Sequence, residues 1–205
     1  MTIRKGEVWG APGPLPAGAV MVASDAEARA VVERARRSGD ELPALGLLGG
    51  DLCRTVGGRG DEARIRAGAG TVLPVDLGVA LVDGRRHSFV AHCVVRGRTP
   101  WRGRVVAAMN AQYVGRYDVA PRSHPNDGRL DVIDVASAFS TTDRWKAWRR
   151  LPAGTHLPHP RITERRVPAI QLDVDGLDVW LDGVRLGPAR TLSLRVEPDA
   201  LTCVV

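Results

Sequence analysis

The stretch TVLPVDLGVALVDGRRHSFVAHCVV, residues 71–95, predicts a β-hairpin. Two apolar runs flank Asp83-Gly84, and Asp-Gly is a residue pair that two-residue hairpin turns prefer. The same pair recurs at residues 127–128, 175–176 and 182–183, among further runs with strand character. Many short strands joined by such turns are typical of a β-sandwich or a barrel.

The residues before this hairpin follow a different pattern. A short apolar run at 19–24 precedes a helix over 25–38, which a capping box at Ser24 begins. The run ALGLLG, at 44–49, is then a buried strand that is parallel to the first, because a helix connects them. DLCRTV, at 51–56, predicts a short helix.

This β-α-β-α unit is short. At about fifty residues it lacks the further strands that a complete mononucleotide-binding half needs to form its cleft. We therefore expect two parts, an incomplete α/β part at residues 1–70 and a β-sandwich at residues 71–205. The predicted fold class is α+β, mainly an antiparallel β-sandwich.

Charge and composition indicate which kinds of molecule this protein is expected to bind. Lys and Arg number 29 against 23 Asp and Glu, which gives a net charge of +6 and favours anionic partners, although arginine-rich usage in a GC-rich genome gives the same balance. No nucleic-acid-binding signature occurs and aromatic residues make up 4%, so nucleic acid is not expected. Three dispersed cysteines favour free thiols in a reducing cytoplasm. No apolar run approaches the roughly 20 residues of a membrane span, so any membrane contact would be peripheral, at the inner surface.

One basic helix interrupts the strand-rich region. TTDRWKAWRRL, at 141–151, has Thr141 or Thr142 as its expected N-cap, with Trp145 and Trp148 three residues apart among arginines and a lysine. Such a helix can lie on an anionic bilayer. The alternative is that the tryptophans pack onto the sheet and the charges face water.

Four segments in a fixed order carry a family resemblance. They are PVDLG (74–78), RVVAAMNAQYVGRYDVAPRSHPNDGRLDVIDV (104–135), GTHLPHPRI (154–162) and VWLDGVRLG (179–187). Together they resemble the bacterial diacylglycerol kinase and YegS-like lipid kinase family. The resemblance implies a β-sandwich second domain that contributes the lipid-substrate side of a kinase cleft, with ATP and Mg²⁺ as the possible cofactors.

A fifth segment, LGGDLCRTVGG at 48–58, resembles the family motif GTGNDLARTLG, with Gly50 where the family has Asn. No upstream segment matches the family's GGDGT loop, which helps to hold ATP phosphates, so the resemblance makes residues 1–70 a truncated remnant of the nucleotide-binding domain. Gly49, Gly50, Asp51 and Arg54 are candidates for phosphate binding, because N–H groups at a helix start hold anions. The alternative is that Asp51 caps the following helix.

Asp182 aligns with the proposed general base of the family. The family has Glu two residues later, where this chain has Val184, which can neither polarise a partner nor bind a cation. The alternative is that Asp182 only forms the hairpin turn with Gly183.

Asp127 aligns with a structural magnesium ligand of the family. The resemblance adds backbone carbonyls, which we assign to His124 and Arg129, and such hard oxygen donors suit Mg²⁺. The alternative is again a simple Asp-Gly turn.

Three hypotheses for function follow. The first is a degenerate relative of the kinases that binds a lipid, a phosphorylated small molecule or a protein partner without phosphotransfer. The second is an active ATP-dependent lipid kinase with Asp182 as its base, whose nucleotide site is completed by dimerisation. The third is a structural or assembly protein that forms a homodimer through residues 19–60.

Overall fold

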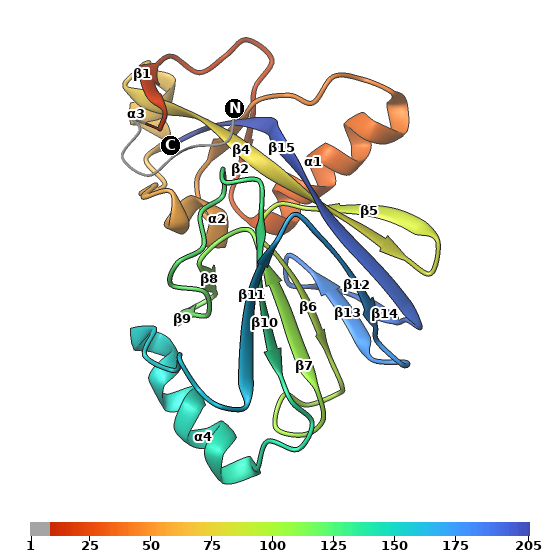
Figure 1. Cartoon of the computed structure of the whole chain (residues 1–205). Coiled ribbons are helices and arrows are strands. Elements are labelled where there is room, and N and C mark those ends of the chain that lie inside the picture. The colour runs from red at the N-terminus through yellow and green to blue at the C-terminus, as the bar shows by residue number, and fades with distance from the viewer. Residues whose placement is uncertain (1–8) are drawn as a thin grey trace.

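The computed structural model describes residues 9–205, so the first eight residues of the expected N-terminal part lie outside the described residues. Within this range two β-sheets form a sandwich, with helices at one end and beside the second sheet (Figure 1). The prediction of a mainly antiparallel β-sandwich is confirmed. Sheet A has seven strands in the described range: β1 (Ala11–Gly13), β2 (Val20–Val22), β3 (Leu45–Leu47), β4 (Gly70–Val82), β5 (Arg85–Phe89), β12 (Ala169–Asp173) and β15 (Thr191–Val204).

Sheet B has six strands in the order β11-β10-β7-β6-β13-β14 within the same range. They are β6 (His92–Arg96), β7 (Val105–Met109), β10 (Leu130–Val135), β11 (Ile162–Val167), β13 (Asp178–Leu181) and β14 (Val184–Pro188). The other elements are α1 (Asp25–Ser38), α2 (Gly50–Thr55), α3 (Glu62–Arg66), the strand pair β8 (Tyr113–Val114) and β9 (Tyr117–Asp118), α4 (Thr141–Arg150) and the 3₁₀ turn η1 (Leu151–Ala153).

Strand β7 shows how sheet B separates two apolar regions. Val106 and Ala108 belong to the core between the sheets, whereas Ala107 and Met109 belong to a second cluster on the other face. Because side chains alternate along a strand, one apolar run supplies both faces. Sheet B is therefore covered by sheet A on one side and presents an apolar surface to α4 on the other.

The predicted hairpin at Asp83-Gly84 is present, with Val82 paired to Arg85 across the turn. Asp83 has φ 45° and Gly84 has φ 82°, the left-handed conformation that a tight hairpin turn needs at both positions.

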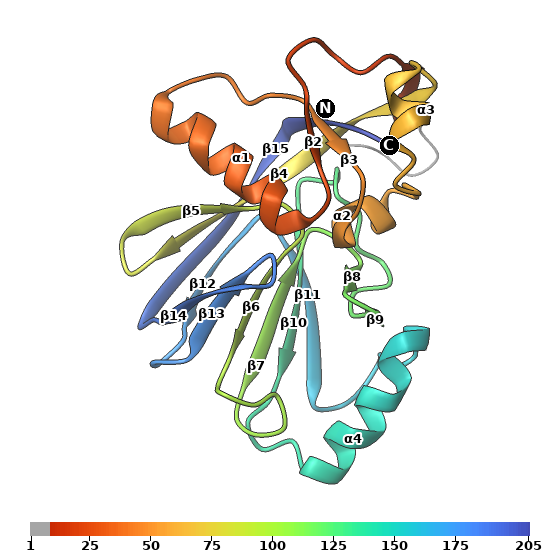
Figure 2. The ribbon, with the colours of Figure 1, turned by 180° about the vertical axis from the view of Figure 1, so that it is seen from behind.

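The segment before residue 70 joins the sandwich. Strand β2 pairs with β3 in parallel, as predicted, and β3 in turn pairs in parallel with the last strand, β15, where Leu45 lies opposite Cys203. Figure 2 shows α1 and these short strands from behind, beside β15. Ser24 caps α1 by accepting the N–H of Glu27, as its capping box predicts.

The expected N-cap of α4 is wrong by one or two residues. Ser140 caps the helix, since its Oγ accepts the N–H of Asp143 at 3.1 Å, and Thr141 is already the first helical residue. Among residues 9–205, no helix has the length and apolar character that crossing a bilayer would require.

Candidate functional site

Asp25 occupies the start of helix α2, although it belongs to α1. Its buried carboxylate accepts the backbone N–H of Asp51 at 2.5 Å and that of Leu52 at 3.1 Å. Burial raises the pKa of Asp25, while the two N–H groups act in the opposite direction. The interpretation of Asp51 as the cap of this helix is therefore wrong: Asp25, distant in sequence, satisfies the free donors.

Gly50 is required by this arrangement. It has φ +96°, and a Cβ placed there would lie 2.5 Å from an oxygen of Asp25. An asparagine at this position, as in the family motif, would overlap that carboxylate. The glycine and Asp25 thus form a matched pair, in which an internal carboxylate takes the place of an anion at the helix start.

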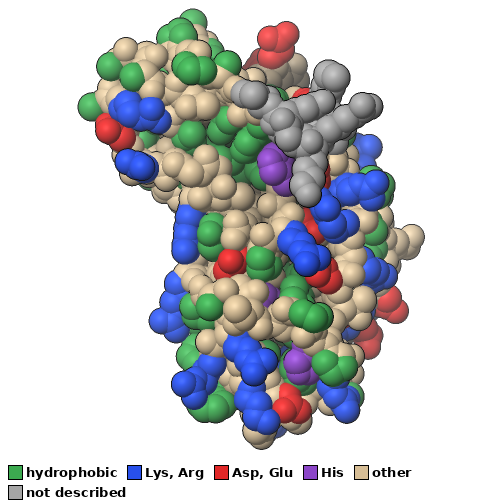
Figure 3. Space-filling model, turned by 60° about the vertical axis from the view of Figure 1, so that its left-hand side comes forward, with side chains coloured by type: hydrophobic (Ala, Val, Ile, Leu, Met, Phe, Trp, Pro, Cys, Tyr) green, Lys and Arg blue, Asp and Glu red, His purple; other side chains and the backbone are tan. Residues whose placement is uncertain are grey.

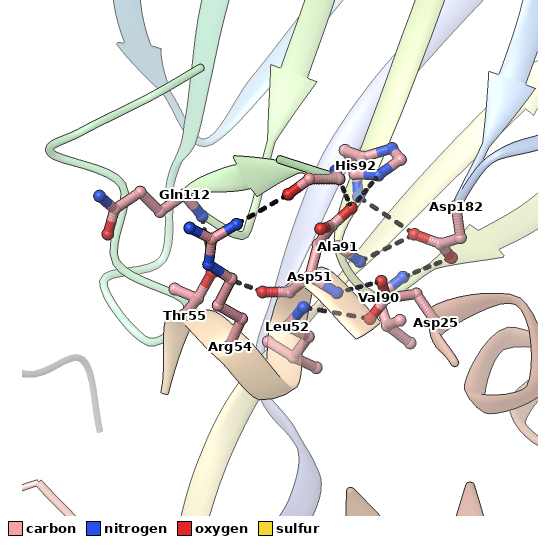
Figure 4. A network of polar contacts seen from close by, with 11 residues as sticks. Asp25, Asp51, Leu52, Arg54, Thr55, Val90, Ala91, His92, Gln112 and Asp182 are labelled. Atoms are coloured by element: carbon pink, nitrogen blue, oxygen red, sulfur yellow. Dashed lines mark hydrogen bonds and ion pairs between the residues drawn. The ribbon is translucent and has the colours of Figure 1, made fainter. Parts of the chain in front are cut away.

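Asp51 points from α2 toward sheet B and binds His92. Its Oδ2 lies 3.1 Å from His92 Nε2 and accepts the N–H of Gly115 at 3.0 Å (Figure 4). Burial alone would lower the pKa of His92, but the hydrogen bond to Asp51 and the nearby Asp182 outweigh it and raise that pKa. Burial would likewise raise the pKa of Asp51, yet His92 and Gly115 lower it. Both shifts favour an imidazolium–carboxylate pair.

Asp182 forms the β13–β14 turn and also fixes the start of β6. It has φ 49°, and it is 6% exposed. Burial raises its pKa to about 6, although the hydrogen bonds and His92 oppose that effect. The carboxylate accepts three backbone N–H groups, those of Val90 at 2.9 Å, Ala91 at 2.9 Å and His92 at 3.1 Å.

The structure brings Asp51 and Asp182 together at His92, which the sequence did not indicate (Figure 4). One carboxylate contacts the imidazole ring and the other contacts the backbone of the same residue. A base role for Asp182 stays a prediction, but its carboxylate already serves three donors.

Arg54 is directed away from the start of α2. Its guanidinium donates to the carbonyl of Gly115 at 2.9 Å and lies 3.8 Å from the ring centre of Tyr113. Thr55 adds a second link to the same loop, because its Oγ donates to Asp51 O and accepts from the N–H of Gln112. Phosphate binding by Gly49, Gly50, Asp51 and Arg54 stays a prediction; in this structure the segment holds α2 against sheet B.

The turn that contains Asp127 is neutralised by an arginine. Asp127 Oδ1 accepts the N–H of Arg129 at 3.0 Å, and its Oδ2 forms an ion pair with Arg166. Arg166 Nε also lies 3.2 Å from Asp131 Oδ1, and the pairing of β10 with β11 sets Asp131 directly opposite Arg166. His124 uses its Nδ1 to accept the N–H of Asn126.

A guanidinium therefore stands where a cation beside Asp127 would stand. No cluster of three or more His, Cys, Asp or Glu side chains suited to a metal occurs in residues 9–205. As arranged, the residues at Asp127, with the carbonyls of His124 and Arg129, do not fit an additional divalent cation.

A separate apolar cavity of about 560 Å³ lies between α4 and sheet B. Ala107 and Ile133 line it from the sheet, Ala147 and Trp148 from the helix, and none of the carboxylates described above borders it. The sequence contained the alternating apolar strands but did not predict this cavity. The alternative that the tryptophans of this helix pack toward the sheet holds for Trp148, which lines the cavity. Trp145 does not follow it, because its side chain is 48% exposed.

Arg144 lines the cavity and has a structural role. It is 5% exposed and has no carboxylate partner among the described residues. Burial lowers its pKa. Its guanidinium donates to four backbone carbonyls, those of Pro100, Gly103, Ala136 and Phe139.

Comparison with known proteins places this geometry in a family. Residues 74–205 match the family model described as the YegS C-terminal NAD kinase beta sandwich-like domain. A candidate diacylglycerol kinase from Bacillus anthracis str. Sterne has a similar fold, with a TM-score of 0.66 at 16% identity over 90% of this chain and 77% of that chain. A second structure, of a diacylglycerol kinase from the same strain, gives a TM-score of 0.57 at 17% identity over 90% of this chain and 74% of that one. No curated protein matches significantly.

Proposed function

Because the chain belongs to the family of YegS C-terminal NAD kinase β-sandwich-like domains, we propose that it binds a lipid and holds an acyl chain in the cavity between α4 and sheet B. The observation that carries the proposal is the cavity itself. Its volume of about 560 Å³ lies within the range of roughly 300–1,000 Å³ typical of small-molecule sites.

The walls of the cavity suit a hydrocarbon chain. Valine, isoleucine, alanine and aromatic side chains supply most of the lining, and Arg144 directs its donors to backbone carbonyls. Burial of each methylene group from water contributes roughly 0.8 kcal/mol, so a chain gains affinity without any polar contact. We assign the cavity one acyl chain, with the polar end of the lipid at its mouth.

We further propose that this chain alone does not transfer phosphate. Asp25 fills the helix start at which a phosphate would be held, and Asp51 and Asp182 place further carboxylates beside it. These carboxylates would repel a triphosphate. Asp182 already accepts three N–H groups, which leaves its carboxylate poorly placed to take a proton from a substrate hydroxyl.

Lipid binding is tested with a soluble single-chain probe, a dansylated fatty acid, whose fluorescence rises in an apolar site. We expect saturable binding that Ala147→Phe weakens, because Ala147 faces the cavity and the added ring fills it. Lys146→Phe, which adds the same ring to the exposed side of α4, should bind the probe like the native protein. Equal binding by both variants would place the probe elsewhere and refute the cavity assignment.

Phosphotransfer is tested separately with radiolabelled ATP, Mg²⁺ and a panel of single-chain and two-chain lipid alcohols. We expect no transfer to lipid above a protein-free control. Transfer that the native protein supports would overturn the non-catalytic proposal and favour the active-kinase hypothesis, while leaving the cavity assignment intact.

A further inference from the structure

Helix α4 forms one wall of the cavity and has two chemically different faces. Arg144, Ala147 and Trp148 line the cavity, at a spacing of three and four residues that places them on one side of a helix. The other side of the helix forms an outward face that is exposed to solvent. This outward face consists of Trp145, Lys146, Arg149 and Arg150, all of them exposed.

The outward face combines one large aromatic side chain with cations. Trp145 is 48% exposed, and the guanidinium of Arg149 lies 4.9 Å from its ring centre. The one acidic residue of the helix, Asp143, lies in its first turn, where it accepts from Ser140 and lies 3.4 Å from Lys146. In Figure 3, Lys and Arg side chains are spread over the visible face of the molecule, its lower part included.

Neighbouring loops extend this cationic surface around the cavity. Arg144 holds the loop at 97–103 against α4 through the carbonyls of Pro100 and Gly103. The loop carries Arg98 and Arg102, both exposed. Near the cavity-lining Trp148 stands the exposed Arg116, with its guanidinium 5.7 Å from the indole ring centre.

We propose that the outward face of α4 docks on an anionic lipid bilayer, with Trp145 at the level of the headgroups. Cations near an anionic membrane surface are attracted to it, and tryptophan favours the interface between headgroups and water. Charge complementarity selects the anionic surface, and the apolar cavity directly behind the helix selects a lipid over another polyanion. The inference rests on the proposed lipid function and adds where the lipid comes from.

Sedimentation with vesicles tests the docking. Native protein should bind phosphatidylcholine vesicles that contain phosphatidylserine at about a one-third share, bind pure phosphatidylcholine vesicles weakly, and be released by salt. Arg149→Gln/Arg150→Gln should weaken partition about thirtyfold, from roughly 1 kcal/mol for each cation near the surface. Trp145→Ala should weaken it at low and at high salt, because the ring contributes apolar contact.

Arg34→Gln/Arg37→Gln is the matched control, since it removes two exposed arginines from α1, at the far end of the molecule from α4 (Figure 1). Equal weakening by both double variants would show a non-specific charge effect and overturn the assignment to α4. Binding to duplex DNA as tight as to the vesicles, lost in the same α4 variant, would overturn the assignment to lipid. Failure to bind vesicles with unchanged binding of the soluble probe would refute the docking alone and leave the cavity proposal standing.

Discussion

The carboxylate of Asp25 lies 2.5 Å from the backbone nitrogen of Asp51, so the first residue of one helix satisfies the start of the next. A contact of this kind fixes two helices with a single side chain. It also places negative charge where the sequence motif suggests an anion site. One buried side chain therefore links α1 to the start of α2.

Removal of Asp25 should destabilise the fold. Asp25→Ala leaves two N–H groups without their acceptor in a largely buried place, which costs about 1–3 kcal/mol in the free energy of unfolding. Urea denaturation measures the change. Asp40→Ala, at an exposed carboxylate beyond α1, should change stability by less than about 0.5 kcal/mol, and an equal loss in both variants would contradict the role of Asp25.

The pair of His92 and Asp51 should give pH-dependent stability. The folded-state pKa of His92 is raised, so its contribution is fully present below the unfolded pKa of about 6.5 and is lost as pH rises through the folded value. His92→Gln should therefore lose more stability near pH 5.5 than near pH 8.5. Denaturation of the native and variant proteins at both pH values checks this, and an equal loss at the two pH values would contradict the role of the pair.

Asp182 should be important for stability whatever its role in chemistry. Asp182→Asn offers one acceptor oxygen to three N–H groups and places an amide donor against them, so we expect a loss of about 1–3 kcal/mol. Asp175→Asn is the control, because Asp175 also precedes a glycine, has a similar φ of 40° and is exposed. If the two substitutions cost the same, the turn conformation and not the carboxylate network would explain the effect.

The guanidinium of Arg166 should supply the positive charge beside Asp127 and Asp131 that a metal ion would otherwise supply. Chelation by EDTA or addition of Mg²⁺ should leave the melting temperature of the native protein unchanged. Arg166→Met should lower it, because Asp131 is fully buried and its pKa, already raised to about 6 by burial, loses the guanidinium that opposes this rise.

The neighbouring exposed residue supplies the control for this experiment. Arg165→Met on the same strand should change the melting temperature little. The ion pair of Arg165 with Asp134 is long, at 3.8 Å, and lies at a partly exposed site. A fall in the native melting temperature on chelation would instead support a bound cation at Asp127.

Local signals predicted the parts of the fold that depend on neighbours in sequence. The Asp83-Gly84 hairpin, the helix after Ser24 and the parallel pair of β2 and β3 all follow from turn chemistry, capping or chain connection. The interpretation of Asp51 failed because the acceptor at α2 comes from Asp25, which is 26 residues away, and no local pattern encodes that contact.

The sequence identified two residues of the candidate site but did not show how they lie relative to each other. Asp182 and Asp51 were both singled out from motifs, yet His92, which joins them, belongs to neither motif. The contact between Arg166 and Asp131 was also not predicted, and the register of two strands explains it. Arg166 reaches Asp131 because β10 and β11 align them, and sequence alone does not fix which residues of two strands lie opposite.

The parallel contact between β3 and β15 joins the segment before residue 70 to the last strand of the described chain. A fragment that begins at residue 71 would lack β3 and would leave the end of β15, at Cys203 and Val204, with an unpaired strand edge that is open to association with other molecules. We therefore expect that an engineered division of this protein must keep Leu45 and Cys203 within one cooperative unit.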